Sequence, residues 1–351
     1  LNFLTVVSKK NLKIFKIDKA ESELTREIKI FLGDIIAQND ISKSSNAITN
    51  SLFSTFDLSK FKEKEIYLIY DQQLSHLPFS ALLFEDKYLI ENFTLTHIPS
   101  FPSLFYLKNK SASNYENSLI GFANPKLNEN KNFILDNNLI SKILRSSGDE
   151  IITNIQKLPE LPNTESELLK ISRMVSGKKK LFTRDDASEI NAKTINLNAQ
   201  YLIFATHALI AGEIDNIYES GLVLTPPNEE DQLTEQNDGF LSEHEIINLD
   251  INSDLTLLSA CNTARSGDRN DSDSLSGLTK SFFYAGSNNV LSTLWSIETN
   301  SAEAFTEIFF QNIMNNFSYS DSSQKAKISL INSKKYNHPF FWAPYILAGL
   351  N

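Results

Sequence analysis

Short apolar runs alternate with amphipathic segments along most of the chain after residue 117. The runs at 201–205, 255–260 and 289–295 carry few polar side chains, which is typical of strands covered on both faces of a parallel sheet. Segments with helical spacing lie between the runs, at 163–175, 185–195, 273–284 and 301–314. This alternation predicts an α/β fold, with an open and mostly parallel sheet and helices on both faces.

The first third of the chain has a more mixed pattern. Alternating apolar residues at 1–17 predict a hairpin, and helical spacing predicts helices over 19–36 and 44–53. Further apolar runs predict strands at 66–70, 88–91 and 93–97, and a last strand at 340–350. Because 108–116 is polar, we expect a smaller α+β lobe over residues 1–115 and a second lobe over 116–351.

Composition and motif searches exclude several classes of function. The chain has 351 residues, a net charge of −10 and no basic stripe, so we expect no direct nucleic-acid partner. No apolar run approaches the roughly 18 residues that a membrane span needs. The single cysteine excludes an internal disulfide and suits the cytosol.

No cofactor or metal is expected either, because the sequence has no glycine-rich phosphate loop and no zinc motif. His244 is followed by Glu245, but no second histidine follows at the spacing of a zinc site. Asp268, Asp271 and Asp273 lack the ligand order of a calcium loop, so we expect a solvated loop there.

Two residues whose side chains could take part in catalysis follow two of the apolar runs. His207 closes the run at 201–205, and Cys261 follows the run at 255–260, 54 positions later. This separation is close to the roughly 50 residues between histidine and cysteine in caspase-type proteases. An imidazole at a neighbouring strand end could take the thiol proton and activate the sulfur. A buried cysteine that only packs, beside a structural histidine, is the alternative.

An ordered set of short motifs resembles the CHAT domain, a caspase-like protease family often attached to tetratricopeptide (TPR) repeats. The order and spacing hold from about residue 60 to the end of the sequence. The matching pieces lie at 66–71, 77–82, 88–91, 99–100, 161–167, 205–207, 241–246, 258–263, 277–286, 290–295 and 338–343. The resemblance implies a caspase- and separase-like fold, with a non-catalytic N-terminal lobe. The implied reaction is peptide-bond hydrolysis through a thioester acyl-enzyme.

Carried over to this sequence, the resemblance makes His207 the general base or acid and Cys261 the nucleophile. The oxyanion hole would use the backbone N–H groups of Cys261 and Ala208. The family usually has glycine where this chain has Ala208. Glycine adopts backbone conformations that cost other residues about 1–2 kcal/mol, and losing one oxyanion donor lowers the rate by about 10²–10³-fold. Ala208 keeps its N–H, so the sequence leaves both outcomes open.

Specificity is predicted from three further positions. Ser259 stands where caspases have the glutamine of their aspartate-binding pocket, and Trp295 closes the run at 289–295. Glu298 follows this tryptophan, where an acid in relatives such as separase could pair with an arginine or lysine of the substrate. The alternative is that Glu298 caps the helix that begins near residue 301.

These observations predict a cytosolic cysteine endopeptidase of the CHAT type that cleaves a protein substrate. We expect a preceding sensor region, such as TPR repeats, or a regulatory protein to control it, and by analogy a setting in prokaryotic defence or regulated cell death. The alternative is a catalytically impaired CHAT scaffold that binds protein partners. A thiol transferase on a similar sheet is a third class, for which the sequence shows no acyl-donor site.

Overall fold

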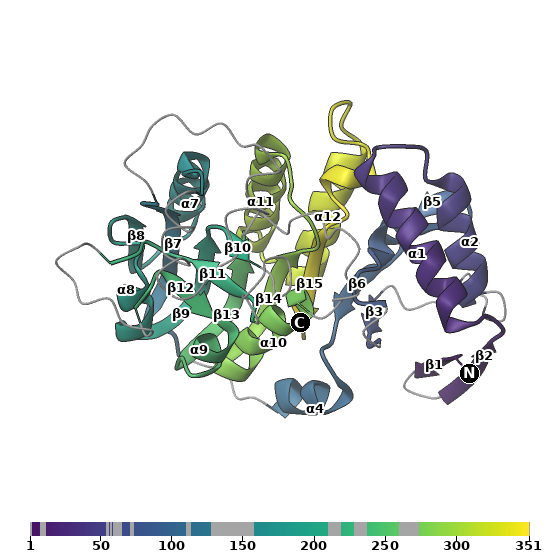
Figure 1. Cartoon of the computed structure of the whole chain (residues 1–351), viewed down its shortest axis with the longest axis horizontal. Coiled ribbons are helices and arrows are strands. Elements are labelled where there is room, and N and C mark those ends of the chain that lie inside the picture. The colour runs from purple at the N-terminus through teal and green to yellow at the C-terminus, as the bar shows by residue number, and fades with distance from the viewer. Residues whose placement is uncertain are drawn as a thin grey trace.

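A mixed sheet forms the centre of the protein in the computed structural model (Figure 1). The structure describes residues 2–7, 12–53, 56, 58, 65–70, 74–109, 114–127, 158–209, 219–227, 237–259 and 274–350. Within these ranges eight strands form one sheet, in the order β3 (Glu65–Leu68), β6 (Thr94–His97), β15 (Tyr345–Gly349), β14 (Ser287–Thr293), β13 (Ile251–Leu258), β9 (Leu197–Ala205), β7 (Asn117–Pro125) and β8 (Lys179–Arg184). Neighbouring strands are parallel except at β14 and β15. The expected mostly parallel α/β sheet is confirmed.

Helices cover both faces of this sheet, as predicted (Figure 1). One face carries α7 (Pro162–Met174), α11 (Thr299–Met314) and α12 (Tyr319–Ile331); the other carries α8 (Glu189–Thr194), α9 (Glu243–Ile247) and α10 (Ser274–Ala285). Successive side chains of a strand point to opposite faces of the sheet, so each face has its own hydrophobic core. In β9, Tyr201 and Ile203 join one core, while Leu202 and Phe204 join the other. The near-continuous apolar runs are therefore strands buried on both sides.

The N-terminal elements agree with the sequence pattern in most places. β1 (Asn2–Val7) and β2 (Leu12–Ile17) form the expected hairpin, whose turn lies outside the described residues. The expected helices are α1 (Glu21–Ile36) and α2 (Ser42–Phe53). They are followed by η3 (Phe79–Ala81), β4 (Leu83–Phe84), β5 (Lys87–Tyr88), α3 (Leu89–Asn92) and α4 (Phe101–Asn109). The core of α1 and α2 is continuous with that of α7, α11 and α12.

Two predicted strands are wrong over part of their length. At 88–91 the strand ends at Tyr88 and helix α3 begins, because the Glu91 carboxylate accepts the backbone N–H of Tyr88 at 2.7 Å and caps the helix. At 340–350 the chain first forms the 3₁₀ helix η4 (Pro339–Phe341), which is capped by His338, and β15 begins only at Tyr345. Pro339 in the first turn favours the helical start.

The sheet extends across the boundary that we expected near residue 115. β3 and β6 come from the first part of the chain, and they join the other strands through β15, which pairs with β6 on one side and β14 on the other. The division into lobes at 1–115 and 116–351 remains a prediction. In the described ranges, none of the helices is both long and apolar enough to cross a membrane.

A second, three-stranded sheet lies beside the carboxyl end of β9. It consists of β10 (Ala208–Leu209), β11 (Gly221–Val223) and β12 (Phe240–Ser242), which are antiparallel to one another. β11 lies within a short apolar run at 221–225, whereas its two partners have no comparable run. Because β10 follows β9 almost directly, this small sheet holds the chain on both sides of His207.

Candidate active site

His207 lies two residues beyond the end of β9, next to the strand that leads to Cys261. β9 and β13 are parallel neighbours, and their register places Phe204 opposite Leu258. In the sequence, His207 and Cys261 each follow this pair by three positions. Cys261 itself lies outside the described residues, as do Asp268, Asp271 and Asp273.

The His207 imidazole is almost completely buried, with 1% of the residue exposed. Its Nε2 lies 2.8 Å from the carbonyl oxygen of Pro159. A carbonyl only accepts hydrogen bonds, so Nε2 carries the proton, and in the neutral ring Nδ1 is the nitrogen with the basic lone pair. Burial lowers the pKa of His207, and the hydrogen bond to Pro159 raises it by less. The imidazole is therefore neutral at pH 7 and can accept a proton through Nδ1.

The backbone around His207 is fixed by β11. The N–H of Val223 donates to the His207 carbonyl oxygen at 2.9 Å, and the Thr206 hydroxyl donates to the Val223 carbonyl. His207 and Val223 therefore form a hydrogen-bonded pair of the antiparallel ladder. The next pair, Ala208 and Leu222, is of the other kind, in which the backbone groups point away from the partner strand.

Ala208 thus directs its N–H away from β11, from a strand at the edge of the small sheet. Its backbone is extended, as in any strand, so this position does not need the left-handed conformations that favour glycine. The alanine in place of the usual glycine carries no backbone strain here.

Ser259 follows the last residue of β13 and is bound by a buried acid. Its hydroxyl lies 3.3 Å and 3.2 Å from the two carboxyl oxygens of Glu167, which belongs to α7. Each of these two residues is only 7% exposed. Burial raises the pKa of Glu167, while its hydrogen bonds with Thr306 and Ser259 act in the opposite direction to a smaller extent.

The two positions predicted beyond β14 have clear structural partners. The Glu298 carboxylate caps α11 by accepting the backbone N–H of Ser301 at 2.9 Å, and it also accepts from the Asn300 side chain. Desolvation raises the pKa of Glu298, but these hydrogen bonds together lower it. Trp295 is buried in the core, and its ring N–H donates to the carbonyl oxygen of Phe340 at 3.1 Å. The expected cap is present, and a role of either residue in substrate binding stays a prediction.

Comparison with known proteins identifies the family. The family model described as CHAT domain matches residues 42–350. The chain belongs to the CHAT domain family. Among curated proteins, tetratricopeptide repeat protein 28 of Mus musculus is 23% identical over 329 residues, which are 82% of this chain and 12% of the relative. The Homo sapiens protein of the same name is 27% identical over 101 residues, 29% of this chain and 4% of the relative. The CHAT domain thus spans a small part of these relatives.

Solved structures with a similar arrangement have very different sequences. A Saccharomyces cerevisiae separase–securin complex matches this CHAT domain with a TM-score of 0.49 and 12% identity, over 96% of this chain and 23% of that one. The Arg-specific cysteine proteinase gingipain R matches with a TM-score of 0.45 and 8% identity, over 90% of this chain and 69% of that one.

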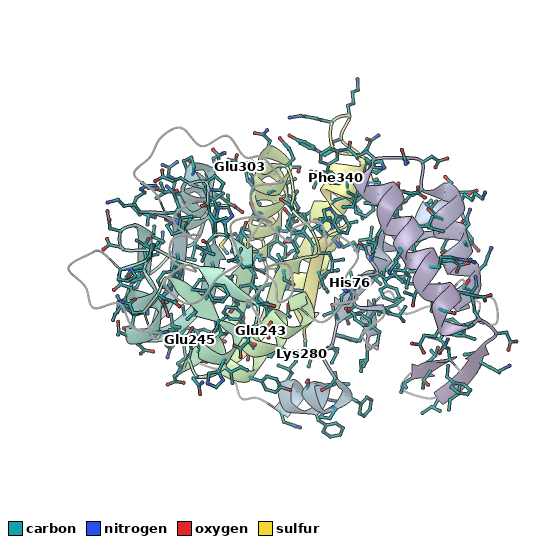
Figure 2. All side chains as sticks on the ribbon, viewed as in Figure 1. His76, Glu243, Glu245, Lys280, Glu303 and Phe340 are labelled. Atoms are coloured by element: carbon teal, nitrogen blue, oxygen red, sulfur yellow. The ribbon has the colours of Figure 1, made fainter. Side chains whose placement is uncertain are left out.

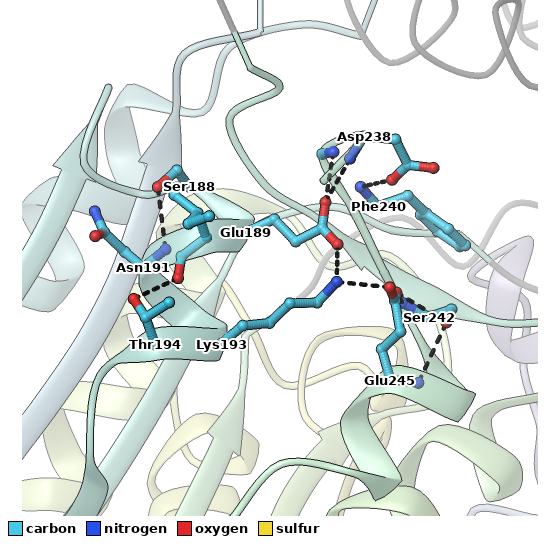
Figure 3. Close-up of polar contacts among 11 residues, drawn as sticks. Ser188, Glu189, Asn191, Lys193, Thr194, Asp238, Phe240, Ser242 and Glu245 are labelled. Carbon is cyan, nitrogen blue, oxygen red and sulfur yellow. Dashed lines mark hydrogen bonds and ion pairs between the residues drawn. The ribbon is translucent and has the colours of Figure 1, made fainter. Parts of the chain in front are cut away.

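A buried ionic network holds the small sheet of the CHAT domain (Figure 3). Glu189 of α8 is fully buried and accepts the backbone N–H of Gly239, just before β12, at 2.7 Å. Lys193 pairs with Glu189 and, at 2.6 Å, with Glu245 of α9. Glu245 in turn accepts the backbone N–H of Ser242 at 2.9 Å. Because β12 pairs with β11, and β11 holds His207, this network supports the histidine from a distance.

Sequence reasoning did not single out Glu167, Glu189 or Pro159 as site residues. Glu167 and Glu189 carry a signal, since each is an acid on the side of an amphipathic helix that faces the core. Pro159 acts through its backbone carbonyl, which every residue has, so its role has no signature in the sequence.

Proposed function

We propose that this CHAT domain is a cysteine endopeptidase that uses Cys261 as nucleophile and His207 as general base. The observation that carries the proposal is the state of His207: a buried, neutral imidazole whose Nε2–H is held by Pro159, at the end of a strand adjacent to β13. Membership of the CHAT family and the equal offset of both residues from the Phe204–Leu258 pair support it.

In the proposed reaction, Nδ1 of His207 takes the thiol proton, and the thiolate attacks the carbonyl carbon of the scissile peptide bond. The backbone N–H groups of Ala208 and Cys261 stabilise the oxyanion. When the intermediate collapses, the C–N bond breaks, the imidazolium gives its proton to the leaving amine, and a thioester remains. Water, deprotonated by His207, then hydrolyses the thioester and restores the thiol.

Substrate recognition belongs to the same proposal. Glu298 would pair with an arginine or lysine of the substrate, near Trp295 and Ser259. While it caps α11, Glu298 remains only half-buried, and its carboxylate is ionised at neutral pH. We further propose control by a preceding TPR region or another regulatory protein, which the names of the curated relatives favour. A cytosolic setting fits the single cysteine, and a role in prokaryotic defence is proposed by analogy alone.

The test is labelling of the folded protein with an electrophilic peptide probe that ends in arginine, measured by intact mass. We expect one adduct on the wild type, none on Cys261→Ala, and a large loss of rate on His207→Ala. His244→Ala, on the exposed face of α9, is the matched control and should react like the wild type. Equal rates for the wild type and His207→Ala would contradict the proposed dyad. Addition of the preceding region or a candidate partner tests regulation in the same assay.

The second candidate is a CHAT scaffold that binds protein partners without cleaving them. The tetratricopeptide repeat proteins among its relatives favour this function, and so does the replacement of the usual glycine by Ala208. The extended backbone of Ala208 reduces the weight of the second point. A scaffold would bind its partner equally well with Cys261 replaced by alanine, and the partner would remain uncut with the wild type.

A further inference from the structure

We infer that Glu167 is a positioning residue that holds the carboxyl end of β13, at Ser259, beside the end of β9 that leads to His207. The inference rests on the proposed function and adds to it a residue that lies outside the dyad. It starts from a buried acid whose only polar contacts within the described ranges are hydroxyl groups.

The surroundings of Glu167 are unusual for an acid. No lysine or arginine in the described part of the chain forms an ion pair with it. Lys170 on the same helix pairs instead with Glu303 of α11, which is labelled in Figure 2. Its neighbours along the same helix, Leu168 and Ile171, belong to the core. An unpaired buried carboxylate is costly, so such a group is retained protonated or for a specific contact.

The count of hydroxyl hydrogens favours a protonated acid. Ser259 donates its one hydroxyl hydrogen to the carboxyl group of Glu167. Thr306 also contacts Glu167, yet its hydroxyl donates to the carbonyl oxygen of Ala302, one turn back in α11, at 3.1 Å. One hydroxyl hydrogen cannot serve both acceptors. A protonated Glu167 supplies the missing hydrogen to Thr306 while still accepting from Ser259. Burial raises the pKa of Glu167 in the same sense, by more than the contacts with Thr306 and Ser259 lower it.

The α7 segment therefore holds the ends of both strands. Just before the helix, the Pro159 carbonyl binds the His207 ring; in its second turn, Glu167 binds Ser259. The helix itself is fixed to α11 by Thr306 and by the ion pair of Lys170. The helix and the residues just before it thus set the relative height of His207 and of the residue two positions before Cys261. A displacement of about 1 Å between reacting groups is worth about 100-fold in rate.

The decisive variants are Glu167→Gln and Glu167→Ala, measured by the rate of Cys261 labelling with the arginine-ended probe. The amide of Glu167→Gln can donate to Thr306 and accept from Ser259, so we expect a rate within about threefold of wild type. Glu167→Ala removes both contacts and should lower the rate by about 100-fold. Ile171→Ala, one turn further along the same face, is the control: it should lower the melting temperature without a comparable loss of labelling rate.

Three results would overturn the inference. Glu167→Ala could react as fast as the wild type; Ile171→Ala at the same melting temperature could lose as much rate; or Glu167→Gln could be as slow as Glu167→Ala. The last result would mean that the contact requires an ionised carboxylate. As a second readout, Glu167→Gln should keep the pH profile of the wild type, since burial raises the pKa of the acid that the amide replaces.

Hydrogen exchange at the end of β13 distinguishes failure of this inference from failure of the proposed function. If wild-type labelling proves independent of His207, the dyad is wrong, but amide exchange over 251–259 still reports whether Glu167 holds this strand. Glu167→Ala, Ser259→Ala and the double variant should then raise exchange over 251–259 equally, because all three remove the contact between Glu167 and Ser259 at the end of this strand. Additive increases would overturn the inference even if the dyad is correct.

Discussion

Replacement of Glu189 by glutamine tests whether the buried network below β12 contains an acid that is costly to ionise. Glu189 is fully buried, and this desolvation raises its pKa from 4.5 to about 7, even though Lys193 donates to it. The folded state therefore binds the proton more tightly than the unfolded state. Its contribution to stability is fully present below about pH 4.5 and is lost as the pH rises through about 7.

The size of the effect follows from the shift. A change from 4.5 to about 7 corresponds to about 3 kcal/mol in the free energy of unfolding, at about 1.4 kcal/mol per unit. The Glu189→Gln side chain is neutral at every pH and can still accept the N–H of Gly239. The free energy of unfolding of the variant, relative to that of the wild type, should therefore rise by up to about 3 kcal/mol as the pH increases from 4.5 to 8.

Urea unfolding followed by circular dichroism at pH 4.5, 5.5, 6.5 and 8 measures this difference. Glu23→Gln, the same chemical change on the exposed side of α1, supplies the control curve. A difference between Glu189→Gln and the wild type that stays constant with pH would refute the burial argument. A variant that becomes relatively less stable as the pH rises would show that the ion pair with Lys193 outweighs desolvation.

Four further predictions concern other parts of the molecule. Lys327→Met removes a buried amine whose pKa is lowered by burial to about 7. The gain in the free energy of unfolding, measured by calorimetry, should therefore be about 2–3 kcal/mol larger at pH 6 than at pH 9. An equal gain at both pH values would contradict this. Gly286→Ala should cost about 2 kcal/mol or more in thermal unfolding, because φ is +125° and a Cβ would lie 1.9 Å from the Ile251 carbonyl oxygen; an unchanged melting temperature would exclude that contact. Glu298→Ala should cost about 1 kcal/mol through the lost cap, and if Glu298 also binds substrate, cleavage after basic residues should fall far more than cleavage after apolar ones. Because burial lowers the pKa of His207, the acid limb of the labelling rate should have its midpoint below 6.5, and a midpoint above that value would argue against a neutral buried imidazole.

The sheet and its covering helices could be predicted because burial on both faces leaves a strong pattern. Leu202 and Phe204 face one core and Tyr201 and Ile203 the other, so the whole run is apolar. The stretch at 88–91 was mistaken for a strand because a single cap, from Glu91, decides its conformation. β10 and β12 are only two and three residues long, too short for any period to appear.

The candidate site was predictable only in part, for a related reason. His207 stands out because a polar residue ends an apolar run, and β9 and β13 are indeed neighbours in the sheet. The groups that support it were not predicted as such, because they depend on tertiary contacts. Pro159 contributes a backbone oxygen, and Glu167 meets Ser259 across 92 positions of sequence. Neither contact follows from local spacing.

The place of β15 between β14 and β6 has a bearing on how the protein is made. A ribosome makes β3 and β6 well before β15, yet β6 needs β15 to cover its inner edge. Until β15 has been made, the earlier strands therefore expose an unpaired edge, which is the feature through which nascent chains aggregate. The sheet can close only when β15 is present, so a product that stalls or is truncated before β15 would present that edge permanently to chaperones and proteases.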